Sequence, residues 1–184
     1  MRPRQPRQIP HEWLMTDPRL GPALWDILEH MPQGSGIVFR DYALPRAERV
    51  ARFARIRRIA RRRGLVLIRA GRAAMRGEDG VHGNDRLRRP GIRTMSVHSR
   101  REAVAALRAG ADAVFVSPVH PTRSHARARA LGRVRTGLIV RDIRVPVVAL
   151  GGMDPIRLGS LRSLRIKRYA AIDAWLQKRK AVPI

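Results

Sequence analysis

The sequence predicts an α/β protein: a single (β/α)8 barrel of the TIM type, in trimmed form. Two observations carry this prediction, namely eight short β-rich runs and the amphipathic helical patterns that separate them along the 184 residues. Alternation of strand and helix indicates βαβ units and a parallel sheet. Eight strands favour a closed barrel, and a doubly wound open sheet is the alternative.

The predicted strands are short, and several are almost continuously apolar, which is typical of parallel strands covered on both faces. They are WLMT from 13, GIVFR from 36, LVLIRA from 65, DGVH from 79, IRTMSV from 92, ADAVFVSP from 111, VPVVALGG from 145 and YAAIDAW from 169. The third, fourth and fifth runs start only 14 and 13 residues apart. We therefore expect the third helix to be reduced or missing and the fourth nearly absent, with little or no helix between 83 and 91.

Three stretches between the strands have the apolar periodicity of amphipathic helices, namely 22–31, 45–64 and 99–110. The expected buried stripe of the second consists of Val50, Phe53, Ile56 and either Ile59 or Ala60. Arginines occupy the other faces of that helix, which we expect to be solvated. In the third stretch, Ser99 is a predicted N-cap that forms a capping box with Glu102.

The composition is that of a globular domain, with 44% apolar residues and no cysteine, so disulfides and thiolate chemistry are excluded. No apolar run approaches the roughly 20 residues of a membrane-spanning helix. The basic start MRPRQPRQIP is followed by no apolar block, unlike a secretory signal. We expect a cytoplasmic protein without a membrane partner, formed by a basic N-terminal extension (1–10) and one barrel domain (11–184).

The formal net charge is +25, and 36 of the 39 basic residues are arginine. A basic surface attracts polyanions such as nucleic acids. These arginines occur in every segment, however, and the aromatic residues that single-strand-binding proteins place among their basic residues make up only 4% of the chain. We therefore expect arginine-biased codon usage to explain the charge, and nucleic-acid binding to be weak and non-specific. A nucleic-acid-binding basic protein is kept as an alternative function.

In a barrel of this kind, functional residues follow the C-terminal ends of the strands. The segment SPVHPTRSH at 117–125 follows the sixth strand and carries more hydroxyls and nitrogens than a connection needs. Gly151 and Gly152 follow the seventh strand, where the backbone N–H groups of glycines approach a phosphate closely. Together with the hydroxyls of Thr122 and Ser124, these glycines predict a site for a phosphate-bearing ligand.

The ordered motifs DGVHGND, SVHSRREAVAALRAGADAVFVSPVHPTRSH and VPVVALGGMDPIRL resemble the thiamine phosphate synthase family and its relative, the thiazole tautomerase. The resemblance is strong over residues 79–158, and LMTDPR and VFRDY are weaker matches. It implies a transferase of thiamine biosynthesis that couples hydroxymethylpyrimidine diphosphate to a thiazole phosphate, releases pyrophosphate and uses Mg²⁺. A thiazole tautomerase-like protein or a catalytically silent phosphate-binding barrel is the alternative within this resemblance.

The resemblance also implies roles for individual residues. Ser96 matches a serine on the fifth strand of the family, and His98 matches the histidine that is catalytic in the tautomerase, so both are catalytic candidates. The implied substrate-binding residues are Arg40, Thr122, Ser124, His125, Gly151 and Gly152. We expect His82, on the short fourth strand, to be structural.

The chain departs from the family pattern at the end of the third strand, where Arg69 and Ala70 replace an Asn-Asp pair whose Asp holds the metal in the family. We expect Arg69 to add positive charge for the substrates, and Asp85 to be the carboxylate that holds Mg²⁺. Three further departures from the pattern are Tyr42 for a lysine, His125 for a lysine and Asp173 for a serine. These departures keep the catalytically silent barrel open as an alternative.

Overall fold

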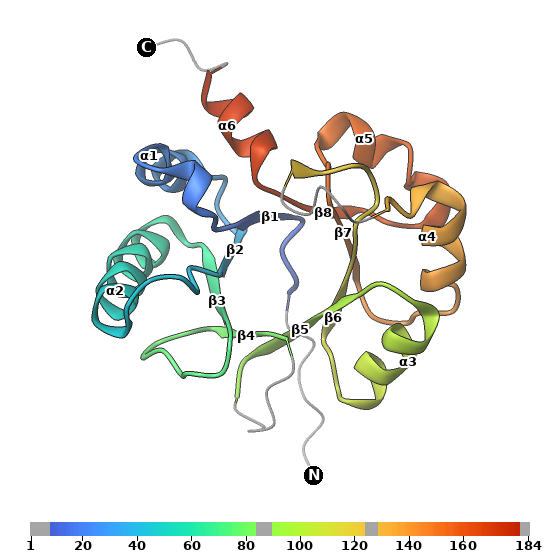
Figure 1. Cartoon of the computed structure of the whole chain (residues 1–184), viewed down its shortest axis with the longest axis horizontal. Coiled ribbons are helices and arrows are strands. Elements are labelled where there is room, and N and C mark those ends of the chain that lie inside the picture. The colour runs from blue at the N-terminus through green and yellow to red at the C-terminus, as the bar shows by residue number, and fades with distance from the viewer. Residues whose placement is uncertain (1–7, 84–89, 124–128, 181–184) are drawn as a thin grey trace.

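Eight parallel strands close into a barrel in the computed structural model, which describes residues 8–83, 90–123 and 129–180. The strands follow chain order around the ring, and the ring closes where the first strand pairs with the last (Figure 1). They are β1 (Glu12–Met15), β2 (Gly36–Phe39), β3 (Val66–Ala70), β4 (Gly80–His82), β5 (Ile92–Val97), β6 (Ala113–Val116), β7 (Val147–Leu150) and β8 (Arg168–Ala171). Each predicted strand is present, and the predicted closed barrel is confirmed.

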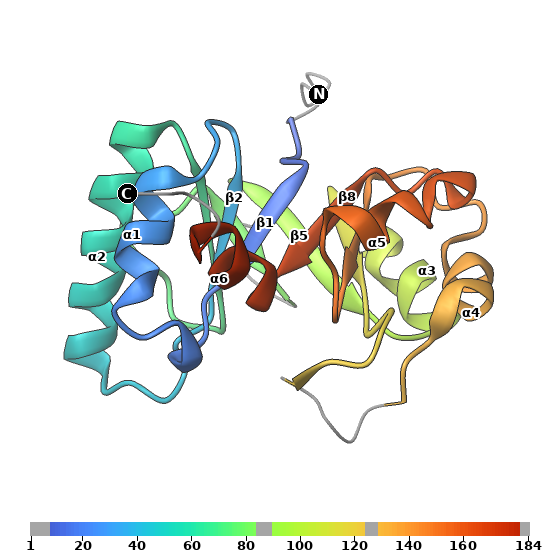
Figure 2. The same ribbon diagram turned by 90° about the horizontal axis from the view of Figure 1, so that it is seen from above.

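Within the described residues, helices follow six of the eight strands. They are α1 (Ala23–His30), α2 (Arg46–Arg63), α3 (Arg100–Arg108), α4 (Gly132–Val140), α5 (Pro155–Gly159) and α6 (Asp173–Lys180). Residues 71–79, between β3 and β4, contain no helix, so the third helix of the barrel is missing. Of the connection between β4 and β5, residues 84–89 lie outside the described part of the chain. Figures 1 and 2 show α1 and α2 on one side of the barrel and α3, α4 and α5 on the other.

Across the described ranges, no helix combines the length and the apolar character that crossing a membrane requires.

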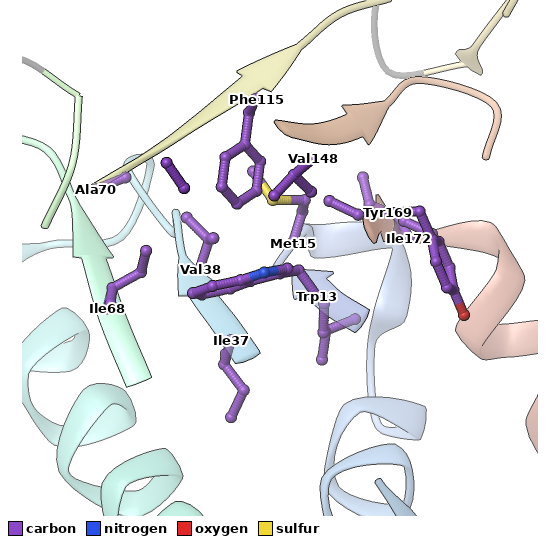
Figure 3. Close-up of a cluster of buried hydrophobic side chains, with 14 of the residues drawn as sticks. Trp13, Met15, Ile37, Val38, Ile68, Ala70, Phe115, Val148, Tyr169 and Ile172 are labelled. Atoms are coloured by element: carbon purple, nitrogen blue, oxygen red, sulfur yellow. The ribbon is translucent and has the colours of Figure 1, made fainter. Parts of the chain in front are cut away.

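Trp13 of β1 is fully buried, and its ring meets Phe115 of β6 edge to face with ring centres 5.4 Å apart (Figure 3). Gly36 of β2 lies opposite Trp13 in the strand register, and a Cβ atom at Gly36 would come within 2.2 Å of the indole. Glycine at this position therefore makes room for the largest side chain of the core. The indole N–H donates to the carbonyl of Pro10 at 3.0 Å, and Ile9 is buried as well, so residues 9–10 pack against the barrel.

The long helix α2 packs on the barrel through the predicted apolar stripe, except at its start. Its buried residues are Phe53, Ile56, Ile59 and Ala60. Val50, predicted to be buried with them, is 48% exposed. An 18-residue helix is about 27 Å long, about twice the length of the four-residue strand before it, so its first turns extend beyond the sheet. Two of its arginines are also not simply solvated, because Arg52 pairs with Asp41 at 2.6 Å and Arg55 covers the ring of Trp25 at 3.6 Å.

The predicted cap of α3 is confirmed and fixes the backbone beside the barrel mouth. The hydroxyl of Ser99 accepts from the backbone N–H of Glu102 at 3.2 Å. In return, the Glu102 carboxylate accepts from the backbone N–H of His98 at 2.9 Å and from the Ser99 hydroxyl at 3.1 Å. The helix N-terminus thereby holds the backbone of His98, one of the predicted catalytic residues.

Candidate active site

The C-terminal ends of the strands and the loops after them surround a cavity of about 1000 Å³. All eight strands are parallel, so the barrel brings residues that are far apart in the sequence to this one mouth. The predicted site residues that line the cavity are Arg40, Ser96, His98, Thr122, Gly151 and Gly152. The predicted residues Asp85, Ser124 and His125 lie outside the described residues.

A chain of hydrogen bonds orients the hydroxyl of Ser96. His82 Nε2 lies 2.9 Å from Ser96 Oγ, and Nδ1 lies 2.8 Å from Thr94 Oγ1. The Thr94 hydroxyl donates to the carbonyl of Val81 at 3.4 Å, so it accepts from Nδ1–H of the histidine. Nε2 is then left without a proton and accepts the hydrogen of the Ser96 hydroxyl. The lone pairs of Ser96 Oγ are therefore free for a ligand in the cavity.

The environment of His82 keeps its ring neutral. Burial lowers the pKa of His82 to about 4, and the positive charge of Arg40 acts in the same direction. The ring also meets Phe115 edge to face at 4.9 Å. His82, which we expected to be structural, lines the cavity, and both of its ring nitrogens are hydrogen-bonded to neighbouring side chains.

His98 is fixed with one ring nitrogen left for a ligand. Its Nδ1 lies 2.7 Å from the backbone carbonyl of Ser117, and a carbonyl oxygen only accepts hydrogen bonds. Nδ1 therefore carries a proton, and in the neutral ring Nε2 is an acceptor and a base. Because His98 lines the cavity, this arrangement provides a proton-accepting nitrogen at the barrel mouth.

Arginines dominate the charge of the cavity wall. The backbone N–H of Arg40 donates to Thr16 Oγ1 at 2.8 Å, which fixes where this arginine leaves β2. The other arginines that line the cavity are Arg72, Arg123 and Arg157. Two carboxylates line it as well, and both lie near arginines: Asp154 is 3.6 Å from Arg157, and Asp173 is 3.2 Å from Arg19. The cavity thus has an excess of positive charge, as an anionic ligand requires.

The loops after β6 and β7 are packed so closely that two glycines are needed. Gly151 and Gly152 have φ angles of 94° and 58°, which L side chains rarely adopt. A Cβ atom at Gly151 would lie 2.8 Å from Pro118, and one at Gly152 would lie 2.4 Å from the carbonyl oxygen of Pro121. The backbone N–H of His120 also donates to the Gly151 carbonyl at 3.1 Å. These contacts hold the two loops together on one side of the cavity.

Arg69 does not reach the cavity, contrary to the expectation that it adds charge for the substrates. Its side chain has no exposed surface, and its Nε lies 2.7 Å from the carboxylate of Glu78. It also donates to the carbonyl of Gly71. The Arg69 guanidinium is therefore buried against the 71–79 turn by its ion pair with Glu78, and it does not line the cavity.

The described residues contain no group of three or more histidine, aspartate and glutamate side chains that could hold a metal ion. Ala70 offers no ligand at the end of β3, and the cavity carboxylates Asp154 and Asp173 lie beside arginines. Asp85, the predicted carboxylate ligand of Mg²⁺, lies outside the described residues.

Comparisons with known proteins agree with this architecture. A family model described as thiamine monophosphate synthase matches residues 15–175. A thiamine-phosphate synthase of Pyrococcus furiosus is 39% identical over 79 residues, which are 43% of this chain and 38% of that protein. One of Methanospirillum hungatei is 37% identical over 110 residues, which are 52% of each chain. The match thus spans about half or less of these curated relatives.

Among solved structures, the thiamine phosphate pyrophosphorylase of Pyrococcus furiosus is similar to this chain, with a TM-score of 0.76 and 24% sequence identity. The similarity covers 91% of this chain and 94% of that one. At this level of identity, the likeness concerns the fold.

Proposed function

The chain belongs to the thiamine monophosphate synthase family, and on that premise we propose that it couples hydroxymethylpyrimidine diphosphate to thiazole phosphate. In this reaction the bond between the pyrimidine methylene carbon and the diphosphate oxygen breaks, and pyrophosphate leaves with the electron pair. The thiazole nitrogen then gives its lone pair to the methylene carbon, which forms thiamine phosphate. One observation carries the proposal: a single cavity has arginines at the ends of β2 and β3 and a glycine pair at the end of β7, on the opposite side of the ring.

The arginine side of the cavity suits the diphosphate. Departure of pyrophosphate concentrates negative charge on the leaving oxygen, and a fixed cation near that oxygen stabilises the charge as it develops. Arg40 is a suitable group, because its backbone is fixed and a guanidinium binds phosphate oxygens in pairs.

The glycine side suits the thiazole phosphate. Thr122 offers a hydroxyl there, and the loop that carries it contains Pro118 and Pro121. Proline restricts the backbone before the ligand binds, so less conformational entropy is lost on binding. Ser96 lies on β5, which stands between β3 and β7 in the ring of strands. The lone pairs of its hydroxyl are available to stabilise the pyrimidine cation.

Three finer points rest on the sequence and are part of this proposal. We propose Mg²⁺ as the cofactor, with Asp85 as its carboxylate, because Mg²⁺ is commonly bound through one or two carboxylates together with substrate phosphates. We also propose a cytoplasmic location, and nucleic-acid binding that is weak and non-specific.

The proposal is tested by incubating the protein with both substrates and Mg²⁺ and measuring thiamine phosphate. Arg40→Ala is expected to lower the rate by about tenfold or more, because a charge-assisted hydrogen bond contributes about 1.5–3 kcal/mol. Arg58→Ala removes the same charge from an exposed position on α2, and it should leave the rate unchanged.

The alternatives give different results in the same experiment. Binding of both substrates without product formation would favour a catalytically silent barrel. Isomerisation of the thiazole substrate, with loss of this activity in His98→Ala, would favour a tautomerase. Absence of substrate binding together with nanomolar, sequence-selective binding of duplex DNA near about 200 mM salt would favour the nucleic-acid-binding protein.

A further inference from the structure

The turn after β3 brings a second arginine to the mouth of the barrel, and its backbone is held in place. Arg49 donates to the carbonyl of Ala70 at 2.8 Å, and Arg69 donates to the carbonyl of Gly71. Both carbonyls that precede Arg72 in the chain are therefore bound by guanidinium groups. Gly71 has a φ of 90°, so it makes a turn that a residue with a side chain rarely makes. The position from which the Arg72 side chain starts is thus well defined.

The side chain of Arg72 is exposed, lines the cavity and is available for a ligand. Among the described residues, neither Arg72 nor the guanidinium of Arg40 has a hydrogen-bond or ion-pair partner. The two arginines come from neighbouring strands, because the register that pairs Phe39 with Arg69 places Arg40 beside Ala70. Two cations on the same side of one cavity repel each other until an anion lies between them.

The carboxylates of the cavity do not neutralise this pair. Asp154 follows β7, which is opposite β3 in the ring of eight strands, and Asp173 follows β8. Each lies beside an arginine of its own neighbourhood, Arg157 and Arg19 respectively. Arg40 also acts electrostatically on Asp17, but that carboxylate is already paired with Arg19 at 2.8 Å. The region near β2 and β3 therefore keeps an excess of positive charge for a ligand.

We infer that Arg72 is a further diphosphate-binding residue, which acts with Arg40 on the same group. This inference rests on the proposed function and deepens it. A diphosphate has oxygens on two phosphorus atoms, so it can contact two separate guanidinium groups at once. A single carboxylate, in contrast, has two oxygens, which one guanidinium group can bind together. Near the end of β3, Arg72 thus binds the ligand, whereas Arg69 is paired with Glu78 and Gly71 of the turn.

The test is calorimetric titration of inorganic pyrophosphate into the full chain at about 150 mM salt, with and without Mg²⁺. Arg72→Ala is expected to weaken binding by about tenfold, and Arg40→Ala by a similar factor. The matched control is Arg76→Ala, because Arg76 is an exposed arginine of the same turn that does not line the cavity. This control changes the net charge equally and should shift the dissociation constant by less than twofold.

The outcomes separate the inference from the proposed function. If the unmodified protein does not bind pyrophosphate under either condition, the proposed function is wrong and the inference with it. If the protein binds pyrophosphate and Arg40→Ala weakens binding while Arg72→Ala does not, the inference alone is overturned. Equal weakening in Arg72→Ala and Arg76→Ala would also overturn it, because the effect would then come from net charge. A tenfold loss in Arg72→Ala against an unchanged control supports the inference.

Discussion

The carboxylate of Glu78 lies 2.7 Å from Nε of Arg69, whose side chain has no exposed surface, and 2.9 Å from the backbone N–H of Met75. Glu78 belongs to the turn between β3 and β4, and Arg69 belongs to β3 itself. A helix covers the outside of the barrel after most other strands. In the 71–79 connection, where no helix is present, this ion pair attaches the turn to the barrel.

We expect Glu78→Gln to lower the free energy of unfolding by about 1.5–3 kcal/mol, because the substitution removes the carboxylate charge that accepts a hydrogen bond from the buried guanidinium of Arg69. Unfolding in urea, followed by circular dichroism, measures this loss. The control is Glu48→Gln on the exposed start of α2, which should change stability by no more than about 0.5 kcal/mol. Equal stability of the two variants would contradict a structural role for the Arg69–Glu78 pair.

Gly152→Val is expected to abolish thiazole phosphate binding, or to weaken it by about tenfold or more. A Cβ atom at this position would lie 2.4 Å from the Pro121 carbonyl oxygen and 3.0 Å from His120 Cβ, so the loop that carries Thr122 has to move. Calorimetry with thiazole phosphate measures the effect. Gly159→Ala is the matched control, because a Cβ atom there would meet no other atom within 4 Å and the φ of Gly159 is not positive. Unchanged affinity in Gly152→Val would exclude the glycine pair from the phosphate site.

The features of this molecule that the sequence predicts are those that depend on residues close together in the chain. The strands and the Ser99 cap are set by neighbouring residues, and both were predicted correctly. Val50 was predicted wrongly because its burial depends on how far α2 extends past a short strand. Arg69 lies near the C-terminal end of β3, which suggested that it faces the mouth, but the carboxylate of Glu78, nine residues later, determines where its side chain points. The hydrogen bonds of His82 depend on the register between β4 and β5, which the sequence pattern leaves open.

The low pKa of His82 makes stability depend on pH in a defined window. The pKa is about 4 in the folded protein and about 6.5 in the unfolded chain, so between these values the unfolded state binds more protons. The free energy of unfolding should therefore be highest above pH 6.5, decrease as the pH falls to 4, and lose nothing further from this group below that. The loss is on the order of 3 kcal/mol, because each pKa unit of difference corresponds to about 1.4 kcal/mol.

Urea unfolding between about pH 4 and pH 7 measures this contribution of His82. The slope should be shallower in His82→Gln than in the unmodified protein, because glutamine does not titrate. Carboxylates contribute to both slopes, and the difference isolates the histidine. His11→Gln, at an exposed histidine, serves as the control and should retain the steeper slope. Parallel slopes for the unmodified protein and His82→Gln would show that the ring is not held neutral.

Ser96→Ala tests whether the oriented hydroxyl acts on the reacting centre. The variant removes the oxygen whose lone pairs face the cavity and leaves His82 Nε2 without its partner at 2.9 Å. If Ser96 stabilises the pyrimidine cation, the single-turnover rate of thiamine phosphate formation should fall by about a hundredfold, as for the loss of one preorganised electrostatic group. Pyrophosphate affinity should stay within about twofold, because Ser96 lies on β5, apart from Arg40 and Arg72, which we propose to bind the diphosphate. Ser163→Ala, at an exposed serine outside the cavity, is expected to retain the full rate. A rate in Ser96→Ala equal to that of this control would exclude Ser96 from the chemical step and leave its hydrogen bond to His82 as a feature of the cavity wall alone.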